Sequence, residues 1–426
     1  MTPSNKRSRV ALRSASAAAI FALGAAALTG CTATTAGGCE LGPTSDGDLT
    51  LKLGTALPQT GNLAFLNPPE EAGVHLAVAE INAAGKGITV DLTLGDSGNT
   101  DNKAYDTEIP RLLNAGVEAI VGAASSSTTL AFIDRVVAEC VVLFSPANTS
   151  AALTTYEDKG LYFRTAPSDV LQGEVLGNLI AADGHQRLGM IVLNDAYGTG
   201  LAGFVKAAFE AAGGEVVAEP TYNTGDTNFT SQINEVLAAD PDAIVLVTFD
   251  EILTIVPALT SQFPGANLYL VDGNNNDYSE AFAPGTLEGA KATYPGVPDS
   301  ELPAGFLDRL AAAWAENGDG TPLEVNLYGP ESYDAVILIA LAALEARSTE
   351  GANISEKLRE VSGGTGNGTK CTSFAECADI IASGGTADYD GASGAVTFDE
   401  AGDPGAGKIL INQYQNDNTF VNIGVS

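Results

Sequence analysis

The chain has 426 residues, of which 20 are Lys or Arg and 53 are Asp or Glu, so its formal net charge is −33. Such an acidic protein repels nucleic acid and anionic lipid surfaces, and neither is an expected partner. Hydrophobic residues make up 45% of the chain and charged residues 17%, a balance typical of a folded globule rather than a disordered chain.

The N-terminus has the pattern of a secretory signal. Four cations within the first thirteen residues precede about fifteen small or apolar residues, a stretch too short to span a membrane comfortably. The stretch ends in "LTGC" at Cys31, which looks like a bacterial lipobox. We therefore expect a signal peptide over 1–30, lipid on Cys31 and a flexible tether over 31–48. The alternative is an ordinary signal peptide with an incidental cysteine.

The cysteines predict disulfides. Five are present, and if Cys31 carries lipid, the remaining four suit two disulfides in an oxidising compartment. The short loop favours Cys371–Cys377, and Cys39–Cys140 follows by elimination. Metal ligation is the competing interpretation, but only two histidines and no CxxC or HExxH motif occur, so we expect no metal site.

Strand and helix patterns alternate along the first third of the chain. This alternation predicts a parallel sheet with helices on both faces. Strands are expected over 49–57, 87–96, 117–123 and 140–145, with helices over 69–85, 104–116 and 128–139 between them.

A second round of the same alternation begins near residue 168. Ile120 and Ile244 hold equivalent positions in the two rounds, as if one architecture were used twice. The sequence therefore predicts an α/β fold of two Rossmann-like lobes with more than one crossing between them. The expected helices are 171–184, 201–214, 228–240 and 252–263, the expected strands are 187–196, 215–222, 242–249 and 267–272, and two more helices (305–317 and 329–346) precede two or three short strands within 394–425.

One glycine motif raises a different possibility. Gly198, Gly200 and Gly203 form G-x-G-x-x-G between a predicted strand and a predicted helix, the order found in dinucleotide-binding turns. Glu219 lies at roughly the distance where such sites place an acid, but Pro220 follows it directly. Because an exported protein meets essentially no NAD, an NAD-dependent oxidoreductase stays a remote alternative, and we expect no cofactor.

Hydroxyl groups follow two strands of the first round. Ligands of open parallel sheets bind beyond the carboxyl ends of the strands. The third predicted strand delivers Ser125, Ser126 and Ser127 at a helix start, where hydroxyls and free backbone N–H groups suit a carboxylate. The fourth delivers Ala147, with its carbonyl, and Thr149, with its hydroxyl. We expect these loops to form one polar cradle, although a simple serine N-cap would need only one hydroxyl.

Aromatic and acidic residues end the strands of the second round. They are Asp195 and Tyr197, Phe249 and Asp250, and Asp272. A zwitterion fits between the two rounds, with its carboxylate on the serines and its ammonium on an aspartate. Each aromatic taken alone would more often belong to the core. The sequence has neither a nucleophile elbow nor a Walker P-loop, so we do not expect an enzyme.

Eight short motifs occur in order: "LPQTG", "AVAEINAAG", "VGAASSST", "SPANTS", "FRTAPSD", "DAYGTG", "SYDA" and "YDGASGAVTFDEAGD". From about Leu49 to the C-terminus, this set resembles the solute-binding lipoproteins of branched-chain amino acid ABC transporters. These are type I periplasmic binding proteins of the leucine/isoleucine/valine-binding class. The resemblance implies a two-lobed clamp with a three-segment hinge. The N-terminal lobe would contain 49–167 and 295–393, and the C-terminal lobe 168–294 and 394–426.

The resemblance also assigns ligand contacts. It implies that Ser125 holds the ligand carboxylate. The carbonyl of Ala147 and the hydroxyl of Thr149 would receive the ammonium. Asp272 matches the ammonium-binding acid of the family if one gap is allowed.

Three aromatic residues match pocket positions of the family: Tyr197, Phe249 and Tyr328. Phe65 is offset by one residue from the family's usual aromatic in a loop that helps to select the side chain, so we expect it near the ligand. The polar run "DGNNND", Asp272–Asp277, hints at a ligand more polar than leucine, isoleucine or valine.

The expected function is therefore solute binding outside the cytoplasm. The protein would close on a small amino acid-like ligand and present it to an ABC permease. One alternative ligand is an amide, a urea-type compound or another small polar solute, and one alternative role is a ligand-sensing ectodomain. We expect a monomer whose only contact with the membrane is its lipid.

Overall fold

Two large sheets organise the computed structural model, which describes residues 38–323 and 325–426. All of these residues belong to one unit of the chain, Thr34–Ser426. The predicted signal peptide, Cys31 and the first part of the predicted tether lie outside the described residues.

The first sheet has five parallel strands in the order β2-β1-β3-β4-β5. β3 and β4 are buried on both faces, which explains their continuous apolar sequences. The prediction is confirmed for four of these strands and for the three helices between them. The strands are β1 (Leu49–Ala56), β2 (Ile88–Thr93), β3 (Ala119–Gly122), β4 (Val142–Ser145) and β5 (Tyr162–Arg164), and the helices are α1 (Asn67–Ala84), α2 (Tyr105–Ala115), α3 (Ser126–Ala138) and the short α4 (Ala151–Thr154).

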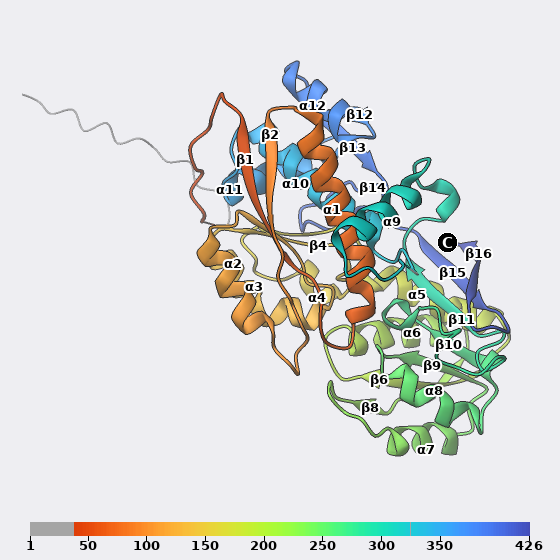
Figure 1. Cartoon of the computed structure of the whole chain (residues 1–426). Helices are drawn as coiled ribbons and strands as arrows, with labels where there is room; N and C mark the ends of the chain where they lie inside the picture. The colour runs from red at the N-terminus through yellow and green to blue at the C-terminus, as the bar shows by residue number, and fades with distance from the viewer. Residues whose placement is uncertain (1–37, 324) are drawn as a thin grey trace, which may run out of the picture. The chain divides into compact units, whose positions relative to one another are not determined.

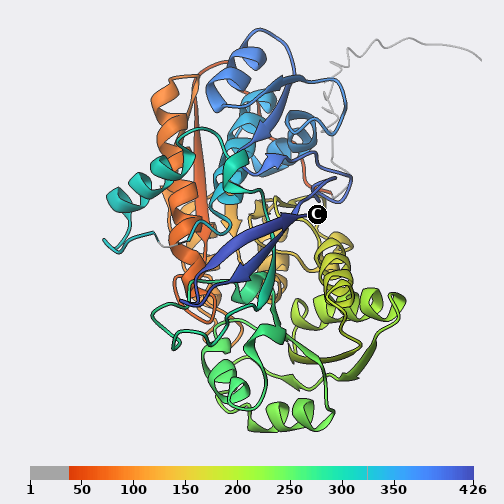
Figure 2. The same cartoon turned by 90° about the vertical axis from the view of Figure 1, so that its right-hand side faces the viewer.

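The second sheet has the order β16-β15-β11-β10-β9-β6-β7, and β8 also pairs with β6. β15 and β16 run antiparallel to their neighbours, and Figure 2 shows this blue C-terminal hairpin beside β11. The strands are β6 (Arg187–Leu193), β7 (Glu215–Ala218), β8 (Thr221–Tyr222), β9 (Ala243–Val247), β10 (Leu268–Leu270), β11 (Lys291–Pro295), β15 (Ile409–Tyr414) and β16 (Phe420–Val425), and the helices are α5 (Asp169–Ala182), α6 (Gly198–Ala211), α7 (Thr230–Ala238) and α8 (Ile252–Thr260).

Four later helices return to the first sheet. α10 packs against α1 and α11, and α9 also packs against α1 (Figure 1). A small third sheet, β12-β13-β14, lies beside them. The sequence predicted α9 (Phe306–Asn317) and α10 (Gly329–Ala346) but not α11 (Gly351–Val361), β12 (Thr369–Cys371), α12 (Phe374–Ala382) or β13 (Ala387–Gly391), and β14 is Gly394–Ala395.

Each large sheet has its own hydrophobic core. The chain changes sides three times: it leaves the first sheet after β5, returns to the helices of the first core after β11, and rejoins the second sheet at β15. The last passage was predicted at 393/394, but β14 pairs with β13 and Phe398 is buried in the first core. The last change of side therefore lies between Phe398 and β15.

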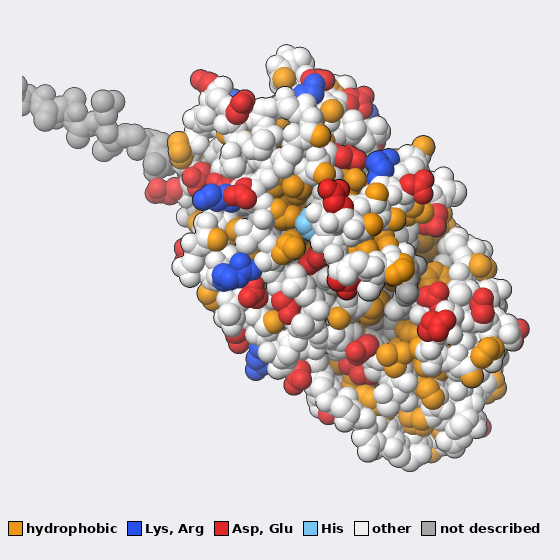
Figure 3. Space-filling view, in the orientation of Figure 1, with side chains coloured by type: hydrophobic (Ala, Val, Ile, Leu, Met, Phe, Trp, Pro, Cys, Tyr) orange, Lys and Arg blue, Asp and Glu red, His pale blue; other side chains and the backbone are white. Residues whose placement is uncertain are grey.

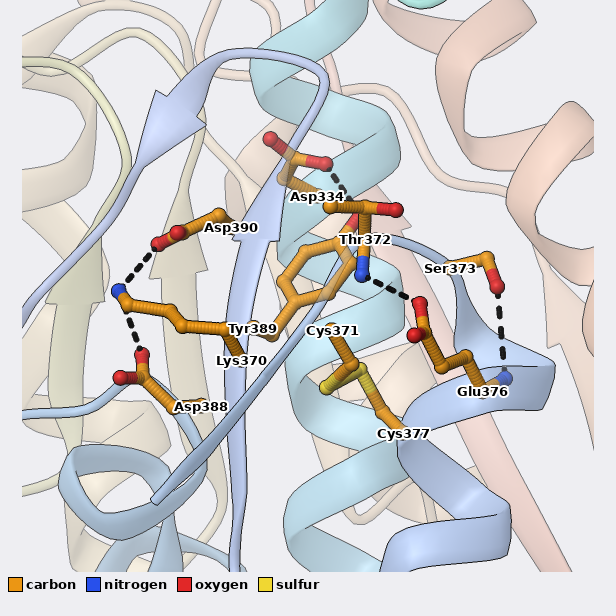
Figure 4. Close-up of a disulfide and its surroundings, with 10 residues drawn as sticks. All are labelled: Asp334, Lys370, Cys371, Thr372, Ser373, Glu376, Cys377, Asp388, Tyr389 and Asp390. Atoms are coloured by element: carbon orange, nitrogen blue, oxygen red, sulfur yellow. Dashed lines mark hydrogen bonds and ion pairs between the residues drawn. A yellow bond between two sulfur atoms is a disulfide. The ribbon is translucent and has the colours of Figure 1, made fainter. Parts of the chain in front are cut away.

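Both predicted disulfides are present, Cys39–Cys140 and Cys371–Cys377. Figure 4 shows Cys371, at the end of β12, joined to Cys377 in α12, with the ring of Tyr389 beside them. The tether prediction is wrong for the part of 31–48 that the structure describes. Cys39 is buried in its disulfide, and the backbone N–H of Gly42 donates to Asn353 Oδ1 at 2.7 Å.

Acidic side chains are scattered over the face shown in Figure 3, with fewer Lys and Arg among them. No helix within residues 38–323 and 325–426 is both long enough and apolar enough to cross a membrane.

Candidate functional site

A small cavity lies where loops of the first sheet meet loops of the second. Its free volume is only about 10 Å³, close to the room that one water molecule needs. Eight of the nine residues predicted to bind ligand line it, drawn from both sheets and from the start of α10. The lining residues are Leu63, Leu66, Ala124, Ser125, Ser126, Ala147, Thr149, Tyr197, Phe249, Asp272, Gly273 and Tyr328.

The loop from β3 to α3 forms one wall. Gly122 ends β3 with φ +129°, and a Cβ there would lie 2.1 Å from the carbonyl oxygen of Ala56, so only glycine fits. Ser125 then caps α3 by accepting the N–H of Thr128 at 3.3 Å. Its hydroxyl hydrogen stays free to donate into the cavity. This hydroxyl and the start of α3 are groups of the kind that suit an anion.

The other two serines have different partners. Ser126 Oγ accepts the N–H of Ser150 at 3.2 Å, which fixes the loop after β4 against α3. Ser127 Oγ accepts the N–H of Ala196 at 3.0 Å, so it reaches the loop after β6 in the second sheet. The serine run therefore both lines the cavity and joins the two sheets.

Arg164 fixes the loop that carries Ala147 and Thr149. This fully buried guanidinium donates to Ser150 O at 2.9 Å and forms an ion pair with Asp403 at 2.6 Å. Removing either charge would leave the other buried without its partner. Arg164 is a positioning residue that the sequence prediction did not include, although it lies in the quoted motif "FRTAPSD".

Asp272 is the acidic group of the cavity. Its Oδ1 accepts from Tyr197 Oη at 2.7 Å and from Gln172 Nε2 at 3.0 Å, and its Oδ2 accepts from Tyr328 Oη at 2.8 Å. Burial raises the pKa of Asp272, and these three donors act in the opposite direction. The backbone N–H of Asp272 also lowers this pKa, and in the part of the chain that the structure describes, Oδ2 has a single side-chain donor, Tyr328.

Asp169 is a second buried acid that the sequence prediction missed. It begins α5 and its backbone N–H donates to Thr149 O at 2.7 Å. Burial and the carboxylate of Asp272 raise its pKa well above the usual range, while the side chain of Thr149 lowers it. Neither carboxylate oxygen of Asp169 has a hydrogen-bond partner among the described residues, so Asp169 is a second buried acid beside the cavity.

Aromatic and aliphatic groups form the rest of the wall. The rings of Tyr197 and Phe249 stack with centroids 5.2 Å apart. Gly273 allows this stack, because a Cβ at that position would lie 2.6 Å from Phe249 and 3.0 Å from the Tyr197 hydroxyl. Leu63 and Leu66 come from the loop after β1. The cavity therefore combines a serine hydroxyl at a helix start, a carboxylate and an apolar wall.

Two sequence-based expectations fail at this site. Phe65 does not line the cavity but a separate surface pocket with Pro68 and Leu323, since the short helical turn Ala64–Leu66 directs Leu66 inward instead. The asparagines of "DGNNND" do not line the cavity either. Asn274, for example, bonds Leu246 O, Thr248 and Val271 N, so the run gives no evidence for a polar ligand.

The G-x-G-x-x-G motif serves a local packing role. A Cβ at Gly198 would lie 2.1 Å from Leu193 O, so glycine is required there, but nothing lies within 4 Å of one at Gly203. The third glycine of a dinucleotide-binding turn instead permits close packing of helix on strand. Glu219 forms an ion pair with Lys206 at 3.2 Å. Within the described ranges, no group of three or more His, Cys, Asp or Glu side chains could hold a metal ion.

Comparison with known proteins agrees with this architecture. The Periplasmic binding protein family matches residues 50–384. A chemotactic signal transduction system substrate-binding protein from Halobacterium salinarum is 25% identical over 369 residues, covering 84% of this chain and 86% of its own. A leucine-, isoleucine-, valine-, threonine- and alanine-binding protein from Pseudomonas aeruginosa is 28% identical over 320 residues, covering 73% and 82%.

Solved structures share the fold. The leucine binding protein LivK from Thermotoga maritima superposes with a TM-score of 0.71 at 20% identity, covering 88% of this chain and 98% of its own. An ABC transporter solute binding protein from R. palustris, in complex with benzoate, has a TM-score of 0.68 at 17% identity, covering 88% and 96%. The predicted α/β fold with helix-flanked parallel sheets is confirmed, and the chain belongs to the periplasmic binding protein family, in agreement with the motifs along its sequence.

Proposed function

We propose that the protein binds one amino acid with an apolar side chain in the cavity between the two sheets and delivers it to an ABC permease. The ligand carboxylate would lie at the start of α3, against the hydroxyl of Ser125. Its ammonium would donate to Asp272 Oδ2, to the Ala147 carbonyl and to Thr149 Oγ1. The protein would carry out no chemical step on the ligand.

The buried carboxylate of Asp272 carries this proposal. Three neutral donors already orient the carboxylate, and none of them neutralises its charge. A ligand ammonium would do so, and a buried charge-assisted hydrogen bond contributes about 1.5–3 kcal/mol. Together with the free hydroxyl hydrogen of Ser125 on the other sheet, this arrangement favours a zwitterion over a simple anion or a neutral amide.

The apolar wall supports an aliphatic side chain. Leu63, Leu66 and Phe249 line this part of the cavity, and Asn274 of the loop after β10 bonds Leu246 and Thr248 instead. Burying an aliphatic side chain the size of leucine or valine contributes about 1.5–3 kcal/mol. The Pseudomonas aeruginosa relative, whose name includes leucine, isoleucine and valine, is consistent with this choice.

Closure of two lobes would couple binding to delivery. We assign one lobe to each hydrophobic core, with the three chain passages as the hinge. Because the ligand would contact both lobes only when they close, its binding would shift the population toward the closed form. The closed form is then what a permease would recognise.

The protein would act outside the cytoplasm, in keeping with its family. The "LTGC" pattern supports removal of residues 1–30 and lipid attachment at Cys31. A single acyl chain gives only marginal membrane binding, so stable anchoring needs more than one chain. Mass spectrometry of the mature protein tests this directly: a peptide that begins at an acylated Cys31 is expected.

A sensory role is the second candidate. The Halobacterium salinarum relative is named for chemotactic signal transduction, so the closed form could instead be presented to a receptor. Uptake of labelled leucine by cells with and without this protein separates the roles. Loss of uptake supports transport, whereas unchanged uptake with lost chemotaxis supports sensing.

Calorimetric titration of the purified protein with a ligand panel tests the binding proposal. The panel contains leucine, isoleucine, valine, glutamine, urea and acetamide. We expect binding heat with the aliphatic amino acids and at least tenfold weaker affinity for glutamine. Heat with urea or acetamide alone would favour a small polar solute and contradict the proposal.

A further inference from the structure

A buried hydrogen bond joins the two sheets at one edge of the cavity. Asn62, in the loop after β1, donates through Nδ2 to Oε1 of Glu251 at 2.9 Å. Glu251 lies beyond the end of β9, in the second sheet. Both residues are only 9% exposed, so the bond lies inside the contact between the two sides.

Glu251 is held by its own side of the molecule. Its Oε2 accepts from Tyr222 Oη and from the backbone N–H of Phe249, each at 2.9 Å. Phe249 belongs to the cavity wall, so the same carboxylate that receives Asn62 also fixes the backbone of a cavity-lining residue.

Asn62 accepts one bond from its own side and one from the side of the second sheet. Its Oδ1 accepts from Asn99 Nδ2 at 3.2 Å, and its backbone oxygen accepts the N–H of Asp250 at 3.3 Å. The loop that carries Asn99 also braces the loop after β1 through Asp96, which accepts from the Thr60 hydroxyl at 2.6 Å. Leu63 follows Asn62 directly, so fixing Asn62 fixes one aliphatic part of the cavity.

We infer that Asn62 and Glu251 form a positioning pair that sets the affinity of the binding site without contacting the ligand. The inference rests on the proposed function. The pair joins the backbone of the Leu63 loop to the backbone of Phe249, which lie on opposite sides of the cavity. Closure of the two sides forms this bond, and their separation breaks it.

The physical consequence is a bias toward the closed form. In the open form, water replaces Asn62 at the carboxylate, and on closure the bond is made in a buried, low-dielectric site, where it is stronger. A hydrogen bond to a charged group of this kind changes an equilibrium by about 10- to 100-fold. The closed population, and with it the ligand affinity, depends on the bond by that factor.

A double-mutant cycle tests the pair, using the full mature protein and calorimetric titration with leucine. We expect N62A and E251A each to weaken binding by about 10- to 100-fold, and the double variant to be no weaker than the worse single variant. Losses that add in the double variant, or wild-type affinity in N62A, would overturn the inference.

A matched control separates positioning from general stability. The side chain of Asn82 also makes two hydrogen bonds that substitution removes, to Val90 N and Val90 O, but Asn82 is exposed and lies in α1 away from the cavity. We expect N82A to lower the melting temperature and to bind leucine like the wild type. An affinity loss in N82A equal to that in N62A would overturn a specific role for Asn62.

Small-angle scattering keeps this test independent of the proposed ligand. If the wild type binds no amino acid, the proposed function fails, and the pair is judged on the free protein alone. We then expect N62A to have a larger radius of gyration than both the wild type and N82A. Equal radii in the three proteins would overturn the inference.

Discussion

Tyr197 and Asp272 meet at the carboxyl ends of β6 and β10, with the phenol oxygen 2.7 Å from Oδ1 of the carboxylate. The phenol keeps this fully buried acid oriented toward the cavity. Replacing Asp272 by Asn keeps the shape but removes the charge and places an amide NH₂ opposite a donor. We expect D272N to weaken leucine binding by about 3 kcal/mol or more.

Calorimetric titration measures this change, and circular dichroism checks that the fold is kept. If D272N binds leucine as tightly as the wild type, the ammonium does not meet Asp272.

A variant of Ser125 can separate the helix-capping role of this residue from its proposed role in ligand binding. We expect S125A to weaken leucine binding by about 1–3 kcal/mol, since a buried carboxylate loses a donor. S373A is the matched control, because Ser373 caps α12 by accepting the N–H of Glu376, just as Ser125 caps α3. Both variants should lose about 1 kcal/mol of stability, but only S125A should lose affinity. Equal affinities would place the carboxylate elsewhere.

Gly273 should be intolerant of any side chain. A Cβ there would meet Phe249 at 2.6 Å, so we expect G273A to displace the stacked rings and to weaken binding at least tenfold. G203A is the control, because its Cβ would meet nothing within 4 Å and lies inside α6. We expect G203A to bind normally and to gain about 0.5–1 kcal/mol of stability. Normal binding by G273A would contradict the described packing.

The buried carboxyl of Glu331 should make the free energy of unfolding depend on pH. Burial raises the pKa of this carboxyl from 4.5 to about 8, and the nearby Asp334 adds to the effect. Between pH 4.5 and 8 the unfolded chain loses the proton while the folded protein keeps it, so stability falls as pH rises through this window. The E331Q variant has no carboxyl at this position, so it should not lose stability in this way. Its free energy of unfolding should exceed that of the wild type by an amount that grows by about 1–4 kcal/mol across the window.

Urea denaturation at pH 5 and pH 8.5 measures that difference. E356Q, at an exposed position of α11, controls for the change of charge. A difference between E331Q and wild type that stays constant with pH would show that Glu331 does not keep its proton on folding.

Much of the site could be predicted from residue order alone. Parallel strands end at the same edge of a sheet, so the residues after β3 and β4 had to lie near one another, and so did the residues after β6, β9 and β10. This rule groups Ser125 with Thr149 and Tyr197 with Asp272, and the folded chain then brings the two groups to one cavity. The internal likeness of the two rounds likewise predicted two sheets.

The missed features depend on contacts distant in sequence. β5 has three residues and α4 four, too few for a periodic pattern, and β11 is defined by its pairing with β10 and β15. Asp169 and Arg164 stand in a quoted motif, but their roles depend on Thr149 and Asp403, which only the folded chain brings to them. Phe65 lies outside the cavity because a one-residue shift in a helical turn changes the face that a side chain occupies.

The central claim is that one ligand is held by its carboxylate at α3 and by its ammonium at Asp272. Calorimetric titration with leucine, 4-methylpentanoate and 3-methylbutan-1-amine tests it, since the two analogues keep the apolar body and lack one charged group each. We expect leucine to bind at least 100-fold more tightly than either analogue. If 4-methylpentanoate binds as tightly as leucine, the site recognises a simple carboxylate and the account of Asp272 is wrong.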